Sequence, residues 1–231
     1  MTAKEIIDKW DRAAELYYAE QEKSEFARRN KETVELRFKE LHGEKVLDLG
    51  CGCGWYTDFF MKIGGDPVGV DGSEKMIELA RKNYPECKFS IADVTKNLPF
   101  DDSSFDIVFC NQVLMDIEDA KQVFSECHRV LKRGGILYYS IVHPAFYDCT
   151  WQKDENGFRY GKTMTRYIAP YSFNNEFWGE TVHFHRTLSY YLNAAAKAGL
   201  VLKHTEEPSG YDGVTKNADL PLFFFAEYGK N

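Results

Sequence analysis

The sequence predicts an α/β fold, with a mostly parallel sheet covered by helices on both faces. Short apolar runs alternate with segments of helical periodicity over most of the 231 residues, which is the pattern of successive right-handed βαβ units. The apolar runs are continuous and do not alternate with polar residues, as strands buried on both faces require. We therefore expect a single domain spanning residues 1–231.

Residues 1–43 are predicted to form a helical lid. Apolar residues recur there at spacings of three and four among many charges, which is the periodicity of an amphipathic helix. This charged stretch is unlike a signal peptide, and further helix is expected near residues 34–41. The residues that carry the first periodicity are Ile6, Trp10, Ala13, Ala14 and Tyr17.

Strands and helices alternate from residue 45 to residue 142. Five strands are predicted at residues 45–49, 67–71, 88–92, 105–110 and 135–142, with helices at 55–63, 74–83 and 120–131.

The alternation stops at residues 143–186, which are rich in Tyr, Phe, Trp, Asn and Gly. We interpret this segment as an insertion on the side where a substrate would bind. The alternation resumes with a helix at 187–198 and strands at 200–205 and 222–228.

Composition narrows the class of protein. Hydrophobic residues make up 44% of the chain, enough for one sizeable core, and no apolar run approaches the roughly 18 residues of a membrane-spanning helix. The net charge of −7 argues against a nucleic-acid partner, because binding phosphates needs clustered Lys and Arg. The six cysteines form no CxxC pair, so reduced thiols in a cytoplasmic protein are expected. Nothing in the pattern predicts the oligomeric state.

The turn after the first predicted strand carries three glycines, Gly50, Gly52 and Gly54, just before a helix. In an open α/β sheet, ligands bind at the carboxyl ends of the strands. Glycines there allow a tight turn and a close approach of the backbone, and the following helix presents unpaired N–H groups. A nucleotide-like ligand is therefore expected at this turn.

Three ligands compete for such a turn. A dinucleotide site needs GxGxxG, but Trp55 stands where the last glycine should be, and the phosphate-binding string GxxxxGK[ST] does not occur. What remains is DxGxGxG, which begins at Asp48 and resembles motif I of class I S-adenosylmethionine-dependent methyltransferases. The resemblance implies a Rossmann-like seven-stranded sheet with an antiparallel last strand.

Further strings extend this resemblance over residues 46–142. Asp71 ends the second strand, where that family binds the ribose hydroxyls, and Asp93 follows the third, where the family contacts the adenine amino group. The segments 98–115 and 129–137 resemble the family's approaches to strands four and five. The similarity is best to the small-molecule, type-11-like branch. Without this context, an aspartate that closes a strand more often caps the next helix.

The resemblance implies S-adenosylmethionine as cofactor and S-adenosylhomocysteine as product. The residues that it assigns to the cofactor are Asp48, Gly50, Cys51, Gly52, Asp71, Gly72, Ser73, Met76, Asp93, Val94, Asn111 and Gln112.

The side of the methyl acceptor is less constrained. His143 ends the fifth strand, and His185 comes just before the next helix; in a strand, His183 and His185 would share one face. These histidines could be general bases, metal ligands or structural groups. No third ligand is spaced to complete a metal site, so no metal is expected. We predict His143 and His185 as catalytic groups; the other acceptor-side candidates are Tyr17, Tyr18, Tyr147 and Arg186.

The predicted activity is in-line methyl transfer to a small molecule. Residues 111–114 read Asn-Gln-Val-Leu where enzymes that methylate nucleobase or amide nitrogens carry Asn/Asp-Pro-Pro-Tyr, which argues against those acceptors. Two alternatives stay open: a non-catalytic protein that binds the same cofactor, and a methyltransferase with a macromolecular acceptor. The acceptor itself is not predicted.

Overall fold

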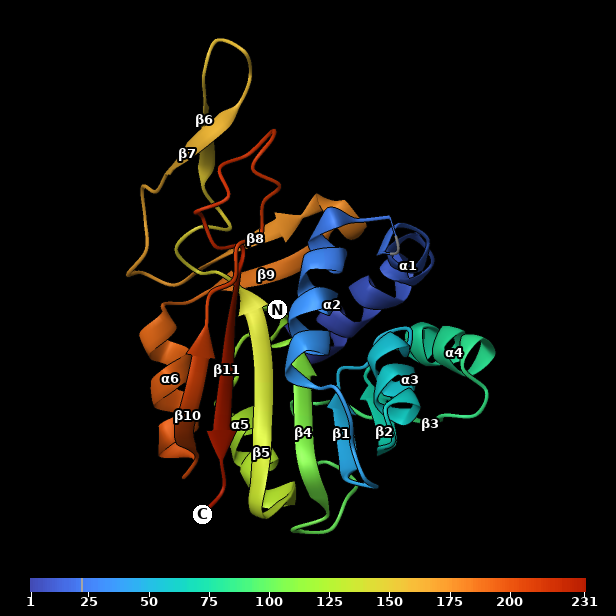
Figure 1. The fold of residues 1–231 in the computed structure, drawn as a ribbon. Coiled ribbons are helices and arrows are strands. Elements are labelled where there is room, and N and C mark those ends of the chain that lie inside the picture. Colours follow the sequence, from blue (N-terminus) through green and yellow to red (C-terminus); the bar gives the residue numbers. More distant parts are fainter. Residues whose placement is uncertain (22) are drawn as a thin grey trace.

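The structure, a computed structural model, describes residues 1–21 and 23–231. Seven strands form its central sheet in the order β10-β11-β5-β4-β1-β2-β3 (Figure 1). The strand β11 is antiparallel to both of its neighbours, and the other pairs are parallel. The predicted sheet with an antiparallel last strand is thus confirmed. The strands are β1 (Lys45–Leu49), β2 (Asp66–Asp71), β3 (Lys88–Ile91), β4 (Phe105–Asn111), β5 (Leu131–Val142), β10 (Val201–Glu206) and β11 (Phe223–Gly229).

Helices cover both faces of this sheet. The alternation of side chains along a strand is seen in β4, where Val108 and Cys110 pack in one apolar cluster with α5 and α6, while Ile107 and Phe109 pack in another with α2 and α3. The helices are α1 (Ala3–Gln21), α2 (Glu25–Arg37), α3 (Trp55–Lys62), α4 (Glu74–Asn83), α5 (Lys121–Val130) and α6 (Leu188–Lys197), with short 3-10 turns η1 (Leu114–Asp116) and η2 (Glu176–Trp178). None of the helices in the described ranges is long and apolar enough to cross a membrane.

The order of the strands reverses at β1. From β1 the chain builds outward through β2 and β3, and it then returns to place β4 and β5 on the other side of β1. Such a reversal leaves a crevice at the carboxyl ends of the two central strands. The glycine turn, which follows β1, lies at this crevice.

The two N-terminal helices lie in different places (Figure 1). The helix α1 packs on α4 and the glycine turn, through a cluster that contains Ala14, Cys53 and Met76. In contrast, α2 packs on a face of the sheet with Val34, followed by Phe38 just beyond its end. The helix expected over residues 34–41 therefore ends earlier, at Arg37, and α2 is as much a layer of the core as part of a lid.

The predicted insertion, residues 143–186, contains two β-hairpins. The strand β6 (Thr150–Lys153) pairs with β7 (Arg159–Thr163), and β8 (Tyr171–Asn175) pairs with β9 (Thr181–His185). Figure 1 shows the first hairpin projecting from the sheet and the second lying beside the N-terminal helices. The sequence predicts where the alternation stops, but these short strands carry no clear periodicity that would reveal them.

Candidate cofactor and acceptor site

The glycine turn needs glycine for a physical reason. Gly50, Gly52 and Gly54 have φ angles of +75°, +51° and +89°, in the left-handed region that costs other residues roughly 1–2 kcal/mol. A Cβ atom on Gly50 would lie 2.4 Å from Cγ2 of Val113. The backbone N–H of Gly50 donates to the carbonyl of Val70 in β2 at 2.8 Å, which fixes the turn against the next strand.

A cavity of about 1180 Å³ opens at this turn. It is larger than the roughly 300–1,000 Å³ of a typical small-molecule site, so one continuous space has room for two ligands. Nine of the twelve residues predicted for the cofactor line it: Gly50, Gly52, Asp71, Gly72, Met76, Asp93, Val94, Asn111 and Gln112.

Asp71 joins the end of β2 to the glycine turn. Its Oδ2 accepts a hydrogen bond from the N–H of Gly52 at 2.9 Å, and its Oδ1 accepts one from the N–H of Ser73 at 2.9 Å. Burial raises the pKa of the Asp71 carboxyl, while these backbone donors oppose the shift. The carboxylate is thus held in one orientation at the wall of the cavity.

Three predicted cofactor residues do not line the cavity. Asp48 is buried behind the turn, where it accepts a hydrogen bond from Oγ1 of Thr57 at 2.6 Å and where burial raises its pKa to about 7. Cys51 is buried in a small apolar cluster with Ile77. Ser73 caps α4 by accepting the N–H of Met76 at 3.1 Å. In this structure the side chains of all three residues are therefore engaged within the protein and not at the wall of the cavity.

Two amide side chains at the end of β4 belong to a polar network. Oγ of Ser140 donates to Asn111 at 2.5 Å and accepts from the side chain of Gln112 at 2.8 Å and from that of Asn30 in α2 at 3.3 Å. Oε1 of Gln112 is buried and has no hydrogen-bond partner. An unpartnered buried acceptor that lines a cavity requires a donor from a ligand or from water.

These features fit S-adenosylmethionine. Carboxylates at the ends of β2 and β3 suit the hydroxyl and amino donors of a nucleoside, and Oε1 of Gln112 suits an ammonium group. The rings of Trp10, Tyr17 and Trp178 line the same cavity; they pack edge to face, with centroids 5.7 Å and 5.2 Å apart. Aromatic walls of this kind favour a positively charged group such as a sulfonium.

The predicted acceptor-side residues have different surroundings. Tyr17 and Tyr147 line the cavity, whereas Tyr18 does not and is 37% exposed. Arg186 is buried outside the cavity, where its guanidinium donates to the carbonyl of Ile117 at 2.6 Å and to that of Glu118. The guanidinium group is therefore hydrogen-bonded to the backbone next to η1 and is not available to bind an acceptor carboxylate.

The two histidines predicted as catalytic also lie outside the cavity. Nε2 of His143 is 2.6 Å from Oε1 of Glu207, and its Nδ1 accepts from the N–H of Ala145 at 3.1 Å. Nε2 of His185 is 2.8 Å from the carbonyl of Tyr167, and its ring stacks on Tyr171 at 4.4 Å. In this arrangement both rings hold the insertion together.

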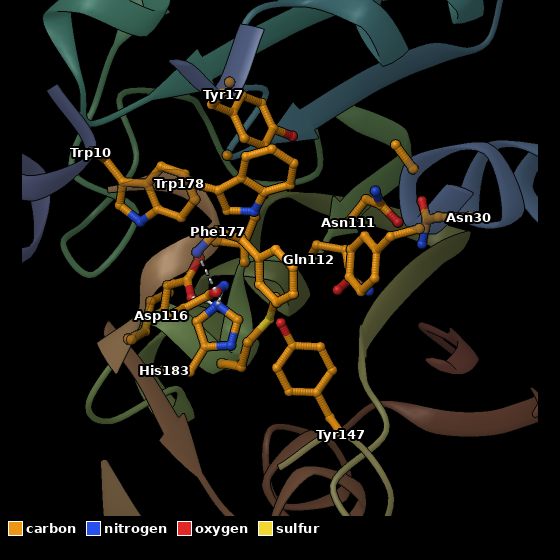
Figure 2. A pocket seen from close by; sticks show the side chains of 18 of the residues that line it. Trp10, Tyr17, Asn30, Asn111, Gln112, Asp116, Tyr147, Phe177, Trp178 and His183 are labelled. Carbon is orange, nitrogen blue, oxygen red and sulfur yellow. Dashed lines mark hydrogen bonds and ion pairs between the residues drawn. The ribbon is translucent and has the colours of Figure 1, made fainter. Parts of the chain in front are cut away.

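A different histidine, His183, lines the cavity. Its Nε2 lies 3.2 Å from Oδ1 of Asp116 and 3.2 Å from Nδ2 of Asn175, while its Nδ1 is buried without a partner. Figure 2 shows the ring between Asp116 and Tyr147. Burial lowers the pKa of His183 and raises that of Asp116, so both groups are favoured in their neutral forms.

The sequence indicates only one member of the pair formed by His183 and Asp116. His183 shares a strand face with His185, but Asp116 lies in a short 3-10 turn after β4 and carries no motif. Within the described ranges, no group of three His, Cys, Asp or Glu side chains is placed to hold a metal ion.

Comparisons with known proteins agree with the fold and the glycine turn. Residues 47–139 match the family model of a methyltransferase domain. A demethylmenaquinone methyltransferase from Chlorobaculum tepidum is 40% identical over 110 residues, which cover 46% of this chain and 44% of that protein. An uncharacterized protein from Haemophilus influenzae is 28% identical over 182 residues, which cover 73% and 71% of the two chains.

The same agreement extends to three dimensions. A crystal structure of an S-adenosylmethionine-dependent methyltransferase from Mesorhizobium loti superposes with a TM-score of 0.76 at 26% identity, covering 91% of this chain and 100% of that one. The fold and the site thus define a Rossmann-like methyltransferase. Over residues 47–139 the chain matches a methyltransferase domain, in agreement with the predicted type-11-like, class I family, and these similarities support S-adenosylmethionine as its cofactor, as predicted. It spans less than half the length of the demethylmenaquinone methyltransferase.

Proposed function

We propose that this protein transfers a methyl group from S-adenosylmethionine to an oxygen atom of a small molecule. The observation that carries the proposal is one continuous cavity. The glycine turn and Asp71 form one of its walls, and Tyr147 and His183 belong to another. A cofactor and an acceptor that share one cavity can be held in line, and such positioning can supply roughly 7–11 kcal/mol of a reaction barrier.

The residues of the chain would bind the two ligands at opposite walls. Asp71 and Asp93 would hold the ribose and the adenine, and Oε1 of Gln112 would accept from the ammonium group. When bound, the cofactor supplies an activated methyl group on a sulfonium. The rings of Tyr17 and Trp178 at this wall would keep water from that charge.

His183 would hold the acceptor oxygen. Oδ1 of Asn175 already accepts the N–H of Phe177 at 3.2 Å, so its Nδ2 faces His183 and donates to Nε2. Because burial favours the neutral form of Asp116, Nε2 has no anionic partner, and we assign the proton of the neutral ring to Nδ1, which is the nitrogen without a partner. Nδ1–H is then a donor for an oxygen of the acceptor and favours its ionised form; the hydroxyl proton leaves to solvent before the methyl group moves from the sulfonium to this oxygen.

Support for a small acceptor comes from the relatives and from charge. The Chlorobaculum tepidum relative is named for demethylmenaquinone, and a relative from Coxiella burnetii is a ubiquinone biosynthesis O-methyltransferase. The net charge of −7 is unfavourable for a nucleic-acid acceptor. A non-catalytic protein that only binds the cofactor would not need a buried donor without a partner opposite the cofactor wall.

The test is methyl transfer from S-adenosylmethionine labelled with CD3. The protein is incubated with a cell extract separated into a small-molecule fraction and a macromolecular fraction, and mass spectrometry locates the label. We expect CD3 on an oxygen in the small-molecule fraction. Label only in protein or RNA, or no transfer to either fraction, would contradict the proposal.

Two variants of His183 distinguish a donor from a general base. A donor to the acceptor oxygen favours its ionised form, so His183→Phe should lower kcat/KM at neutral pH and recover as the pH rises through the pKa of the free acceptor. His183→Asn keeps an N–H donor but no basic nitrogen, and it should stay within about tenfold of the wild type. Equal losses in both variants would show that His183 takes up a proton instead.

A further inference from the structure

The end of the cavity away from the glycine turn is built from two segments. The hairpin β6–β7 contributes Trp151, Arg159 and Lys162, and the loop between β10 and β11 contributes Tyr211 and Lys216. The backbone ties these segments together, because the N–H of Arg159 donates to the carbonyl of Thr215 at 3.1 Å and its carbonyl accepts from Asn217 at 2.8 Å. Three cationic side chains thus line one end of a cavity in a chain whose net charge is −7.

Only one of the three cations is neutralised by a neighbour. Lys216 forms an ion pair with Glu25 at 3.1 Å. The other carboxylate at this end, Asp148, is paired at 3.4 Å with Arg166, which does not line the cavity. Among the residues that the structure describes, Arg159 and Lys162 form no ion pair with a carboxylate. A pair of cations without counterions at the wall of a cavity is suited to an anionic ligand.

Lys162 is held in place and partly buried. Its Nζ donates to the carbonyl of Phe146 and lies 3.5 Å from that of Tyr147, which leaves a third N–H for a ligand. It also lies 4.5 Å from the ring centroid of Trp151. Burial lowers the pKa of Lys162 to about 8; the neighbouring cations Arg159 and Lys216 act in the same direction, and Asp148 opposes them. The charged form of this lysine therefore lacks stabilisation that a bound anion would supply.

A second donor at this end is also without a partner. The side chain of Tyr211 is 5% exposed, it lines the cavity, and its hydroxyl is buried with no hydrogen bond. Its ring packs edge to face on Trp151, with centroids 4.9 Å apart. Buried hydroxyls are normally hydrogen-bonded, and this one is free to donate to a ligand oxygen.

We propose that Arg159, Lys162 and Tyr211 bind an anionic group, a carboxylate or a phosphate, on the methyl acceptor. The proposal rests on the proposed function, in that the cavity receives a small-molecule acceptor. Tyr147 connects the two parts of the acceptor side, since its ring lies 5.6 Å from that of His183 and its carbonyl faces Lys162. The acceptor is therefore a molecule with a reactive oxygen near one end and an anion near the other.

Matched ligands test this charge preference. The binding of 4-hydroxyphenylacetate, 4-hydroxybenzylphosphonate and the neutral 4-hydroxyphenylacetamide is measured by calorimetry, with and without saturating S-adenosylhomocysteine. A charge-assisted hydrogen bond is roughly twice as strong as a neutral one, so the anions should bind about 10–100-fold more tightly than the amide. The better of the two anions identifies the carboxylate or the phosphate as the natural group.

Two variants locate the preference. Arg159→Gln and Lys162→Met should each reduce anion binding about tenfold and leave the amide unchanged. Lys153→Gln is the matched control, because Lys153 is an exposed cation on the same hairpin that does not line the cavity. An equal affinity for the amide and both anions, no binding of either anion, or a preference that survives in both variants would overturn the proposal.

The outcome is separable from that of the proposed function. Stabilisation by S-adenosylhomocysteine should persist in Arg159→Gln and Lys162→Met, which confirms that these variants are folded and that the cofactor wall is intact. If the wild type binds anions selectively but transfers no methyl group, the anion site stands and the proposed function fails. If methyl transfer occurs but only to uncharged acceptors, the anion site fails alone.

Discussion

Replacing Asp71 with alanine is the sharpest perturbation of the cofactor wall. The carboxylate is already oriented by the N–H groups of Gly52 and Ser73, each at 2.9 Å, so its remaining lone pairs are preorganised for the ribose hydroxyls. A hydrogen bond to a charged group contributes about 1.5–3 kcal/mol. Loss of two such bonds removes at least about 3 kcal/mol of binding energy, which corresponds to a rise in Kd of about 100-fold or more.

The assay is calorimetric titration of S-adenosylhomocysteine into wild type, Asp71→Ala and Asp66→Ala. Asp66 lies in the same strand, but its side chain is 52% exposed and pairs with Lys88 at 3.0 Å on the surface. The control variant should therefore bind like the wild type. A change of less than about threefold in Asp71→Ala, in a protein that still melts cooperatively, would refute the ribose assignment.

Three further substitutions test the surroundings of the site. Gly50→Ala should cost roughly 2–5 kcal/mol of unfolding free energy, from its left-handed φ and from overpacking against Val113; Gly50→Ala with Val113→Ala should recover only the overpacking part in urea titrations. Asp48 keeps its proton up to about pH 7 when folded but only to about pH 4 when unfolded, so the wild type should lose stability as the pH rises across this range. The free energy of unfolding of Asp48→Asn, relative to that of the wild type, should rise by up to about 4 kcal/mol between pH 4 and pH 8. If the stability of both proteins changes equally with pH, the buried carboxyl is not the cause. Arg186→Gln should lower the melting temperature, because two buried carbonyls lose a charged donor, while the affinity for S-adenosylhomocysteine stays unchanged; a selective loss of activity without a loss of stability would restore Arg186 as an acceptor clamp.

The cofactor wall was predictable because its signals are local. The strand, the three glycines and the following helix lie within residues 45–62, and the conformation of the turn demands glycine at Gly50. Asp71 and Asp93 could be placed because the carboxyl ends of neighbouring parallel strands meet at one edge of a sheet. Cys51 and Ser73, in contrast, are neighbours of residues that line the cavity but do not line it themselves, which no spacing rule distinguishes.

Tyr17 and Tyr147, predicted for the acceptor side, line the cavity, but the surroundings of the histidines were not predictable because their contacts are long-range. The position of His143 at a strand end favoured it as a catalytic group. Its Nε2 is instead in contact with the carboxylate of Glu207, which lies 64 residues further along the chain. Strand periodicity placed His183 and His185 on one face, yet only the packing of Tyr167 and Tyr171 shows which of them is covered. The partner of His183, Asp116, comes from a turn that only the tertiary fold brings to β9.

The most direct test of the cofactor assignment is thermal unfolding with S-adenosylhomocysteine. A ligand at 100 times its Kd adds about 2.7 kcal/mol to the stability of the folded state, and a chain of this length gains roughly 2–4 °C per kcal/mol. S-adenosylhomocysteine should therefore raise the melting temperature by about 5–11 °C, while NAD leaves it unchanged. A shift with NAD and none with S-adenosylhomocysteine would contradict the assignment of this cavity to an S-adenosylmethionine-dependent methyltransferase.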